Sequence, residues 1–92
     1  MDIISQFVYD ETSPTCLRFK DTGEIAGYIP LNEYDYPYIY LKGRKLSVSL
    51  IIWALHGREL KAGHALIIAD GNNLNCKYSN LKLVSLYQEP LK

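Results

Sequence analysis

Residues 47–57 constrain the fold more than any other stretch of this 92-residue chain. Four apolar residues recur there at i, i+3, i+4 and i+7, the spacing that lines one face of a helix: Val48, Ile51, Ile52 and Leu55. Ser47 is a favourable N-cap residue, and Gly57 suits the left-handed position just after a helix end. Apolar residues occupy the other sides as well, so the helix must be either buried or covered by a partner.

Short strands are predicted on both sides of this helix. Before it, the turn sequences ETSP and DTG separate three strand-like stretches, at residues 7–10, 16–20 and 24–29. The extended segment LNEYDYPYIYL then leads to KGRK, where Gly43 supplies a tight turn. After the helix, residues 65–69 and 81–85 form a hairpin around a polar loop. The expected fold class is α+β, with an N-terminal antiparallel sheet, one central helix and a C-terminal ββ hairpin.

Length and composition predict a single small domain over residues 1–92, with an ordinary globular balance of 48% hydrophobic and 22% charged residues. No apolar run approaches the roughly 20 residues of a membrane span. The start, MDIISQF, lacks the basic and apolar regions of a signal peptide. A cytoplasmic protein is therefore expected, with Cys16 and Cys76 as reduced thiols rather than a disulfide.

The net charge of zero hides an asymmetry between the two halves of the chain. Residues 1–41 carry two basic and seven acidic side chains, a net charge of −5. Residues 42–92 carry eight basic and three acidic side chains, a net charge of +5. Only the second half can therefore supply the basic surface of a nucleic-acid-binding protein. The alternative is that the two halves neutralise each other on one surface.

Four tyrosines two residues apart form the most distinctive surface candidate: Tyr34, Tyr36, Tyr38 and Tyr40. An extended chain places all four rings on one face. Pro37 cannot donate to a sheet, so this segment is expected to be an edge strand or to be only partly paired. Tyrosines anchor protein interfaces and also stack on unpaired bases, but Glu33 and Asp35 repel a phosphate backbone and favour a protein partner. The alternative is that the rings form a buried or half-buried sheet face.

The stretches IIWALHG and DGN, followed by Asn75 and by Asn80 ten residues after Asp70, occur in a distinctive order and spacing. In this order and spacing the chain resembles the HNH, or His-Me finger, endonucleases of phage and homing type. The resemblance covers most of the chain, from FVYDETSPTCLRFK to LKLVS. It implies a ββα-metal frame, a phage or mobile-element origin, and a metal-binding Asp followed by a general-base His at the end of the first hairpin strand.

The positions that carry this chemistry are changed. Ile67 and Ile68 stand where the resemblance places the metal ligand and the base, and isoleucine can neither bind a metal nor accept a proton. Asn80 matches the residue that orients the base and is retained. The last ligand, on a helix after the hairpin, corresponds to Glu89, so the frame is expected to be incomplete, truncated after the hairpin. Two further departures are Ser49-Leu50 for a His-Arg pair and Cys76 for a loop asparagine.

No other catalytic or cofactor site is predicted. His56 and His64 are the only histidines, and no short spacing joins them to the three or four donors of a metal site. Nothing in the sequence places a base beside either cysteine. No phosphate-binding glycine loop occurs, so no cofactor, metal or small-molecule substrate is expected.

We therefore expect a non-enzymatic protein that binds a host macromolecule, in the first place a protein, and modulates or inhibits it. The candidate protein-binding residues are Tyr34, Tyr36, Tyr38, Tyr40, Glu33, Asp35, Leu50 and Trp53. The alternative is a DNA-binding protein that does not cleave and that uses Lys42, Arg44, Lys45, Lys77 and Lys82. The sequence leaves the partner and the oligomeric state open.

Overall fold

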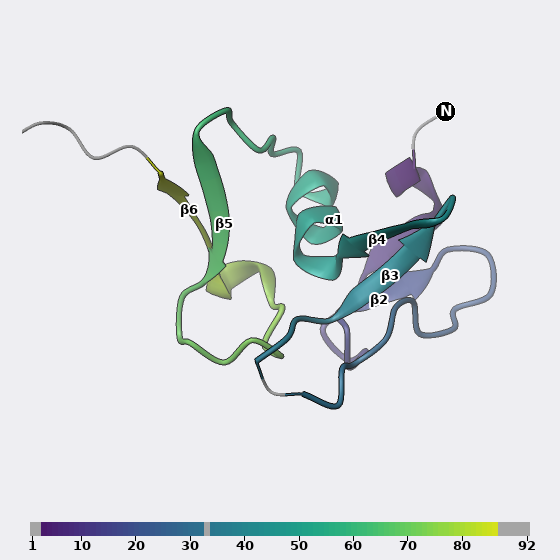
Figure 1. Ribbon diagram of the computed structural model, residues 1–92. Coiled ribbons are helices and arrows are strands. Elements are labelled where there is room, and N and C mark those ends of the chain that lie inside the picture. Colours follow the sequence, from purple (N-terminus) through teal and green to yellow (C-terminus); the bar gives the residue numbers. More distant parts are fainter. Residues whose placement is uncertain (1–2, 33, 87–92) are drawn as a thin grey trace, which may run out of the picture.

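The computed structural model describes residues 3–32 and 34–86, which form three two-stranded antiparallel hairpins, one short helix and two 3-10 turns (Figure 1). The α+β class and the C-terminal hairpin are confirmed. The pairs are β1 with β2, β3 with β4, and β5 with β6. In chain order, the elements are η1 (Ile3–Gln6), β1 (Phe7–Tyr9), β2 (Leu17–Phe19), β3 (Tyr38–Leu41), β4 (Arg44–Ser47), α1 (Val48–Leu55), β5 (His64–Ile68), η2 (Tyr78–Asn80) and β6 (Leu81–Ser85).

The N-terminal half does not form the one continuous sheet that the sequence predicted. The stretch over residues 24–29 makes isolated bridges only, from Ile25 to Arg18 and from Tyr28 to Tyr38. Between these bridges, Gly27 has a φ of +93°, a conformation that interrupts an extended run. The segment therefore links β2 to β3 at single points instead of adding a strand.

Local chemistry sets both ends of α1. Ser47 occupies the N-cap position with an extended backbone, but its hydroxyl pairs with Ser49 Oγ at 2.8 Å rather than with a helix amide. At the other end, Gly57 has a φ of +75°, its amide donates to the Ala54 carbonyl and the Arg58 amide donates to the Trp53 carbonyl. These two bonds form a Schellman motif, which turns the chain back over the last turn of the helix.

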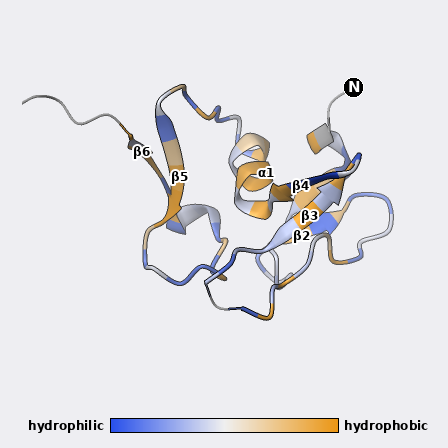
Figure 2. Ribbon diagram, in the orientation of Figure 1, coloured by the Kyte–Doolittle hydropathy of each residue, from blue (hydrophilic) through white to orange (hydrophobic). Residues whose placement is uncertain are grey.

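The core forms around α1, which packs against η1, β1 and β4 and also against η2. Figure 1 shows α1 between the β1–β4 region and the β5–β6 hairpin, and Figure 2 shows hydrophobic residues concentrated on α1 and on part of β5. Val48, Ile51, Ile52 and Trp53 are buried, together with Phe7 and Leu17 of the first hairpin. The sequence left two explanations for this apolar helix, burial in the core or cover by a partner, and burial in the core accounts for most of the helix surface.

Cys16, in the N-terminal half of the sequence, and Cys76, in the C-terminal half, are both free and buried. Burial raises the pKa of the Cys76 thiol to about 12 and also raises that of Cys16. Within residues 3–32 and 34–86 no helix is long and apolar enough to cross a membrane.

Candidate functional site

The β5–β6 hairpin contains the positions at which the resemblance places nuclease chemistry. Ile67 and Ile68 lie near the end of β5, opposite Lys82 and Leu81 of β6. Ile67 is 39% exposed and Ile68 is half-buried. Neither side chain has a metal-binding or titratable group. The described residues contain no group of three histidine, cysteine, aspartate or glutamate side chains that could hold a metal ion.

Asp70, beside these positions, holds the hairpin loop together. Its Oδ1 accepts hydrogen bonds from the Asn72 amide at 2.8 Å and from Asn80 Nδ2 at 3.1 Å, and its Oδ2 accepts one from Asn75 Nδ2 at 2.9 Å. The Asp70 amide in turn donates to Asn80 Oδ1 at 3.2 Å. These bonds, the Asn72 amide first, lower the pKa of Asp70. Asn80 therefore closes the loop on Asp70 in this chain, and the carboxylate is engaged in loop structure.

The four-tyrosine stripe is divided in the structure. β3 begins only at Tyr38, because the preceding residues form a turn and a bend, so the prediction of one extended segment was wrong for Tyr34 and Tyr36. Tyr34 is 79% exposed in that turn. Tyr38 and Tyr40 share a face of β3, with ring centroids 5.5 Å apart in an edge-to-face arrangement. Glu33, named with this stripe, and Glu89, the counterpart of the last nuclease ligand, lie outside the described residues.

A tyrosine face, defined here as Ile25, Tyr28, Tyr38 and Tyr40, forms where the bridged segment meets β3. The Tyr28 and Tyr38 ring centroids are 5.6 Å apart, and Lys45 Nζ lies 4.6 Å from the centroid of the Tyr38 ring. Tyr28 and Tyr40 are 59% and 58% exposed. A groove of about 310 Å³ lies at this face, with Phe19 and Ile39 among its lining residues. Sequence reasoning did not select Ile25 or Tyr28, because a cross-strand neighbour leaves no mark in the spacing of a single strand.

The two helix residues that were expected to meet a partner have different surroundings. Leu50 is half-buried and lines a groove of about 300 Å³ between α1 and β5, together with Tyr36, Leu60 and Leu66. Trp53 is only 7% exposed, and its Nε1 donates to the Glu59 carbonyl at 3.3 Å. Leu50 thus keeps some surface for a partner, whereas Trp53 belongs to the core.

The five basic residues of the DNA-binding alternative do not form one surface. Lys42 lies in the β3–β4 turn, and Arg44 and Lys45 begin β4, while Lys77 precedes η2 and Lys82 lies on β6. Figure 1 shows this turn and β6 on opposite sides of α1. Lys45 is also paired with Asp35, its Nζ lying 3.6 Å from Oδ2.

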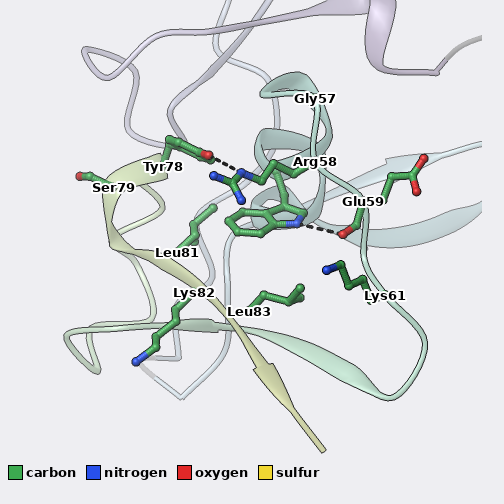
Figure 3. A pocket seen from close by; sticks show the side chains of 10 residues that line it. Gly57, Arg58, Glu59, Lys61, Tyr78, Ser79, Leu81, Lys82 and Leu83 are labelled. Atoms are coloured by element: carbon green, nitrogen blue, oxygen red, sulfur yellow. Dashed lines mark hydrogen bonds between the residues drawn. The ribbon is translucent and has the colours of Figure 1, made fainter.

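A second cluster of basic residues surrounds a groove at the C-terminal end of α1 (Figure 3). This basic groove, defined by Trp53, Arg58, Lys61, Tyr78, Lys82 and Leu83, has a volume of about 690 Å³. The Schellman motif places the Arg58 guanidinium carbon 5.3 Å from the centroid of the Trp53 ring, and Arg58 Nε donates to the Tyr78 hydroxyl at 2.8 Å. Sequence reasoning named Lys82 but missed Arg58 and Lys61, although Gly57 already indicated that the chain turns back there.

The two histidines take part in packing. His56 stacks on Tyr78 with centroids 3.7 Å apart, and its Nδ1 lies 2.8 Å from the Ile52 carbonyl oxygen. The Tyr9 ring meets His56 edge-on, and the Tyr9 hydroxyl accepts a hydrogen bond from the Tyr78 amide at 2.8 Å. His64 Nδ1 lies 3.0 Å from the Ala62 carbonyl oxygen. The His56 cluster therefore ties the first hairpin to η2.

Comparison of the chain with protein-family models, with curated proteins and with solved structures gives no match.

Proposed function

We propose that this protein is a non-enzymatic binding protein whose tyrosine face docks onto a protein partner and thereby modulates or inhibits it. The distribution of exposed apolar side chains carries the proposal. Of the eleven large hydrophobic residues exposed within the described part of the chain, seven lie in residues 25–40. Three of the seven, Ile25, Tyr28 and Tyr40, line the groove of the tyrosine face. Scattered apolar residues are normal on a protein surface, but apolar residues gathered at one groove are typical of an interaction site.

The tyrosine face also has the rigidity of an interface anchor. Tyr38 contacts both Tyr28 and Tyr40 and is itself covered by Lys45, so the exposed rings are held before any partner arrives. A pre-ordered aromatic side chain loses little conformational entropy on binding. The expected partner surface presents an apolar side chain to the groove between Tyr28 and Tyr40, with polar groups around it for the tyrosine hydroxyls.

The β5–β6 hairpin fits an inactive HNH-like frame within this proposal. In the loop that resembles the nuclease motif, Asp70 accepts hydrogen bonds from Asn75 and Asn80, while Ile67 and Ile68 stand where the resemblance places the metal ligand and the base. A hairpin of this kind supports a fold without supplying hydrolysis. We therefore propose a nuclease-like frame of phage or mobile-element type that has been reused for binding.

The test is affinity capture from a host-cell lysate, with mass spectrometry, using matched tyrosine variants. Tyr28→Ser and Tyr40→Ser remove anchors of the tyrosine face, whereas Tyr34→Ser removes a more exposed tyrosine outside it. Truncation of an interface anchor costs about 2 kcal/mol or more, roughly a thirtyfold loss of affinity. The captured protein should bind Tyr34→Ser like the unmodified chain and bind the other two variants more weakly.

Thermal unfolding of each variant separates binding from folding. If Tyr28→Ser and Tyr40→Ser stay folded and capture the same proteins at the same strength, the tyrosine face is not the interface. The DNA-binding alternative is tested in parallel with a labelled duplex at low salt. A shift that weakens steeply with salt and disappears when Arg44 and Lys45 are replaced would favour that alternative.

A further inference from the structure

We propose that the basic groove at the end of α1 is a binding site for an acidic peptide segment, separate from the tyrosine face. Its three cationic side chains come from different parts of the chain. Arg58 follows the helix, Lys61 lies in the connection to β5, and Lys82 lies on β6. Three cations around one groove repel one another, so an anionic ligand that neutralises them is favoured.

The arrangement of the side chains leaves these charges available. Figure 3 shows the Lys61 ammonium directed toward Leu83, the Lys82 side chain extending from the opposite side of β6, and the Glu59 carboxylate turned away from the groove. Within residues 3–32 and 34–86, neither lysine ammonium forms an ion pair within 4 Å. Both ammonium groups are therefore free to meet carboxylates of a ligand.

Arg58 adds a fixed cation to this pair of mobile ones. Its guanidinium lies over Trp53 and donates through Nε to the Tyr78 hydroxyl, so its position is set before a ligand binds. Its two terminal nitrogens have no hydrogen-bond acceptor among the described residues. A planar guanidinium with free terminal N–H groups matches the two oxygens of a carboxylate.

The aromatic residues of the groove favour a peptide over a nucleic acid. Single-stranded nucleic acids bind by stacking bases on open aromatic faces along a basic track. Tyr78 already stacks on His56 at 3.7 Å, and Trp53 is 7% exposed beneath Arg58. The basic cluster of the β3–β4 turn lies on the other side of α1, so no continuous track extends from the groove (Figure 1).

The apolar part of the groove points to the same ligand class. Leu83 is half-buried and lines the groove together with Trp53. A short peptide segment that carries both carboxylates and an apolar side chain can pair its carboxylates with the cationic side chains and pack its apolar side chain in the groove at the same time. A free inorganic anion would use the rim alone.

Fluorescence anisotropy tests the proposal with three labelled probes. The first is a short peptide of alternating glutamate and leucine, the second replaces each glutamate with glutamine, and the third is a single-stranded oligothymidylate of the same charge as the first. The glutamate peptide should bind, its affinity should fall with added salt, and the other two probes should bind more weakly.

A matched pair of double variants locates the site. Lys61→Gln with Lys82→Gln should weaken binding of the glutamate peptide roughly fivefold to thirtyfold, the effect of losing two exposed ion pairs. Lys20→Gln with Lys42→Gln makes the same change of net charge at exposed lysines outside the groove and should leave the affinity within about twofold.

Three results overturn the proposal. They are the absence of glutamate-peptide binding, an equal loss of affinity in both double variants, and tighter binding of oligothymidylate than of the peptide. Circular dichroism melts of both variants establish that each is folded. The outcome is independent of the tyrosine face, because none of the substituted residues belongs to it.

Discussion

Replacing Gly27 with alanine should destabilise the protein more than the loss of a flexible glycine alone explains. Gly27 has a φ of +93°, and a Cβ atom there would lie 3.0 Å from the Tyr38 carbonyl oxygen and 3.0 Å from Val48 Cγ2. Neither neighbour can easily move. The Tyr38 carbonyl accepts a hydrogen bond from the Tyr28 amide at 2.7 Å, and Val48 is fully buried at the start of α1.

Two contributions set the expected size of the effect. The left-handed backbone costs a residue with a Cβ atom about 1–2 kcal/mol. Crowding of a packed core by one extra methyl group costs about 1–3 kcal/mol more. The free energy of unfolding should therefore fall by about 2–5 kcal/mol, which for a domain of this size lowers the Tm by roughly 10 °C or more.

Gly23→Ala is the matched control, measured by thermal and urea unfolding beside Gly27→Ala. Gly23 has a φ of +75°, but a Cβ atom on this residue would meet nothing within 4 Å, so only the backbone contribution applies. The difference between the two variants isolates the close approach of Gly27 to Tyr38 and Val48. Equal losses of stability in the two variants would refute this reasoning.

Three further outcomes are expected. Hydrogen bonds lower the folded-state pKa of Asp70 below its ordinary 3.8. The stability that the Asp70 carboxylate contributes is therefore complete above pH 3.8 and is lost as the pH falls through the folded-state pKa. The stability of Asp70→Asn should accordingly depend less on pH during acid unfolding. Burial raises the pKa of Tyr9 from 10.0 to about 12, so its contribution is complete below pH 10 and is lost as the pH rises through 12. Tyr9→Phe should lower the free energy of unfolding by about 1 kcal/mol at neutral pH, since the Tyr78 amide loses its acceptor. In thermal melts at alkaline pH, the variant should lose less stability than the unmodified protein. With Mg²⁺ or Mn²⁺, neither the unmodified protein nor the double variant Ile67→Asp with Ile68→His should cleave plasmid DNA, because Asp70 and Asn80 remain engaged in the loop. Nicking of the plasmid that survives stringent purification of the protein would contradict this expectation.

The chain's local elements could be read from its sequence because their signals are local. The apolar spacing after Ser47 and the glycine at position 57 mark both ends of α1, and residues 81–85 form β6 as predicted. The first strand of the C-terminal hairpin, β5, was expected at 65–69 and is shifted by one residue to His64–Ile68. The polar loop, too, satisfies its own backbone through Asp70 and neighbouring asparagines, as its composition indicated.

Only the tertiary structure decided which segments lie beside one another. Periodicity tells which side of its own strand a residue faces, but it contains no information about the neighbouring segment, because that depends on packing between distant parts of the chain. Tyr28 therefore joined Tyr38 and Tyr40 through a single bridge, while Tyr36 turned to a different groove. Arg58 and Lys82 likewise share the basic groove because α1 packs against η2, which leads directly into β6, a contact made by the folded core and not by sequence spacing.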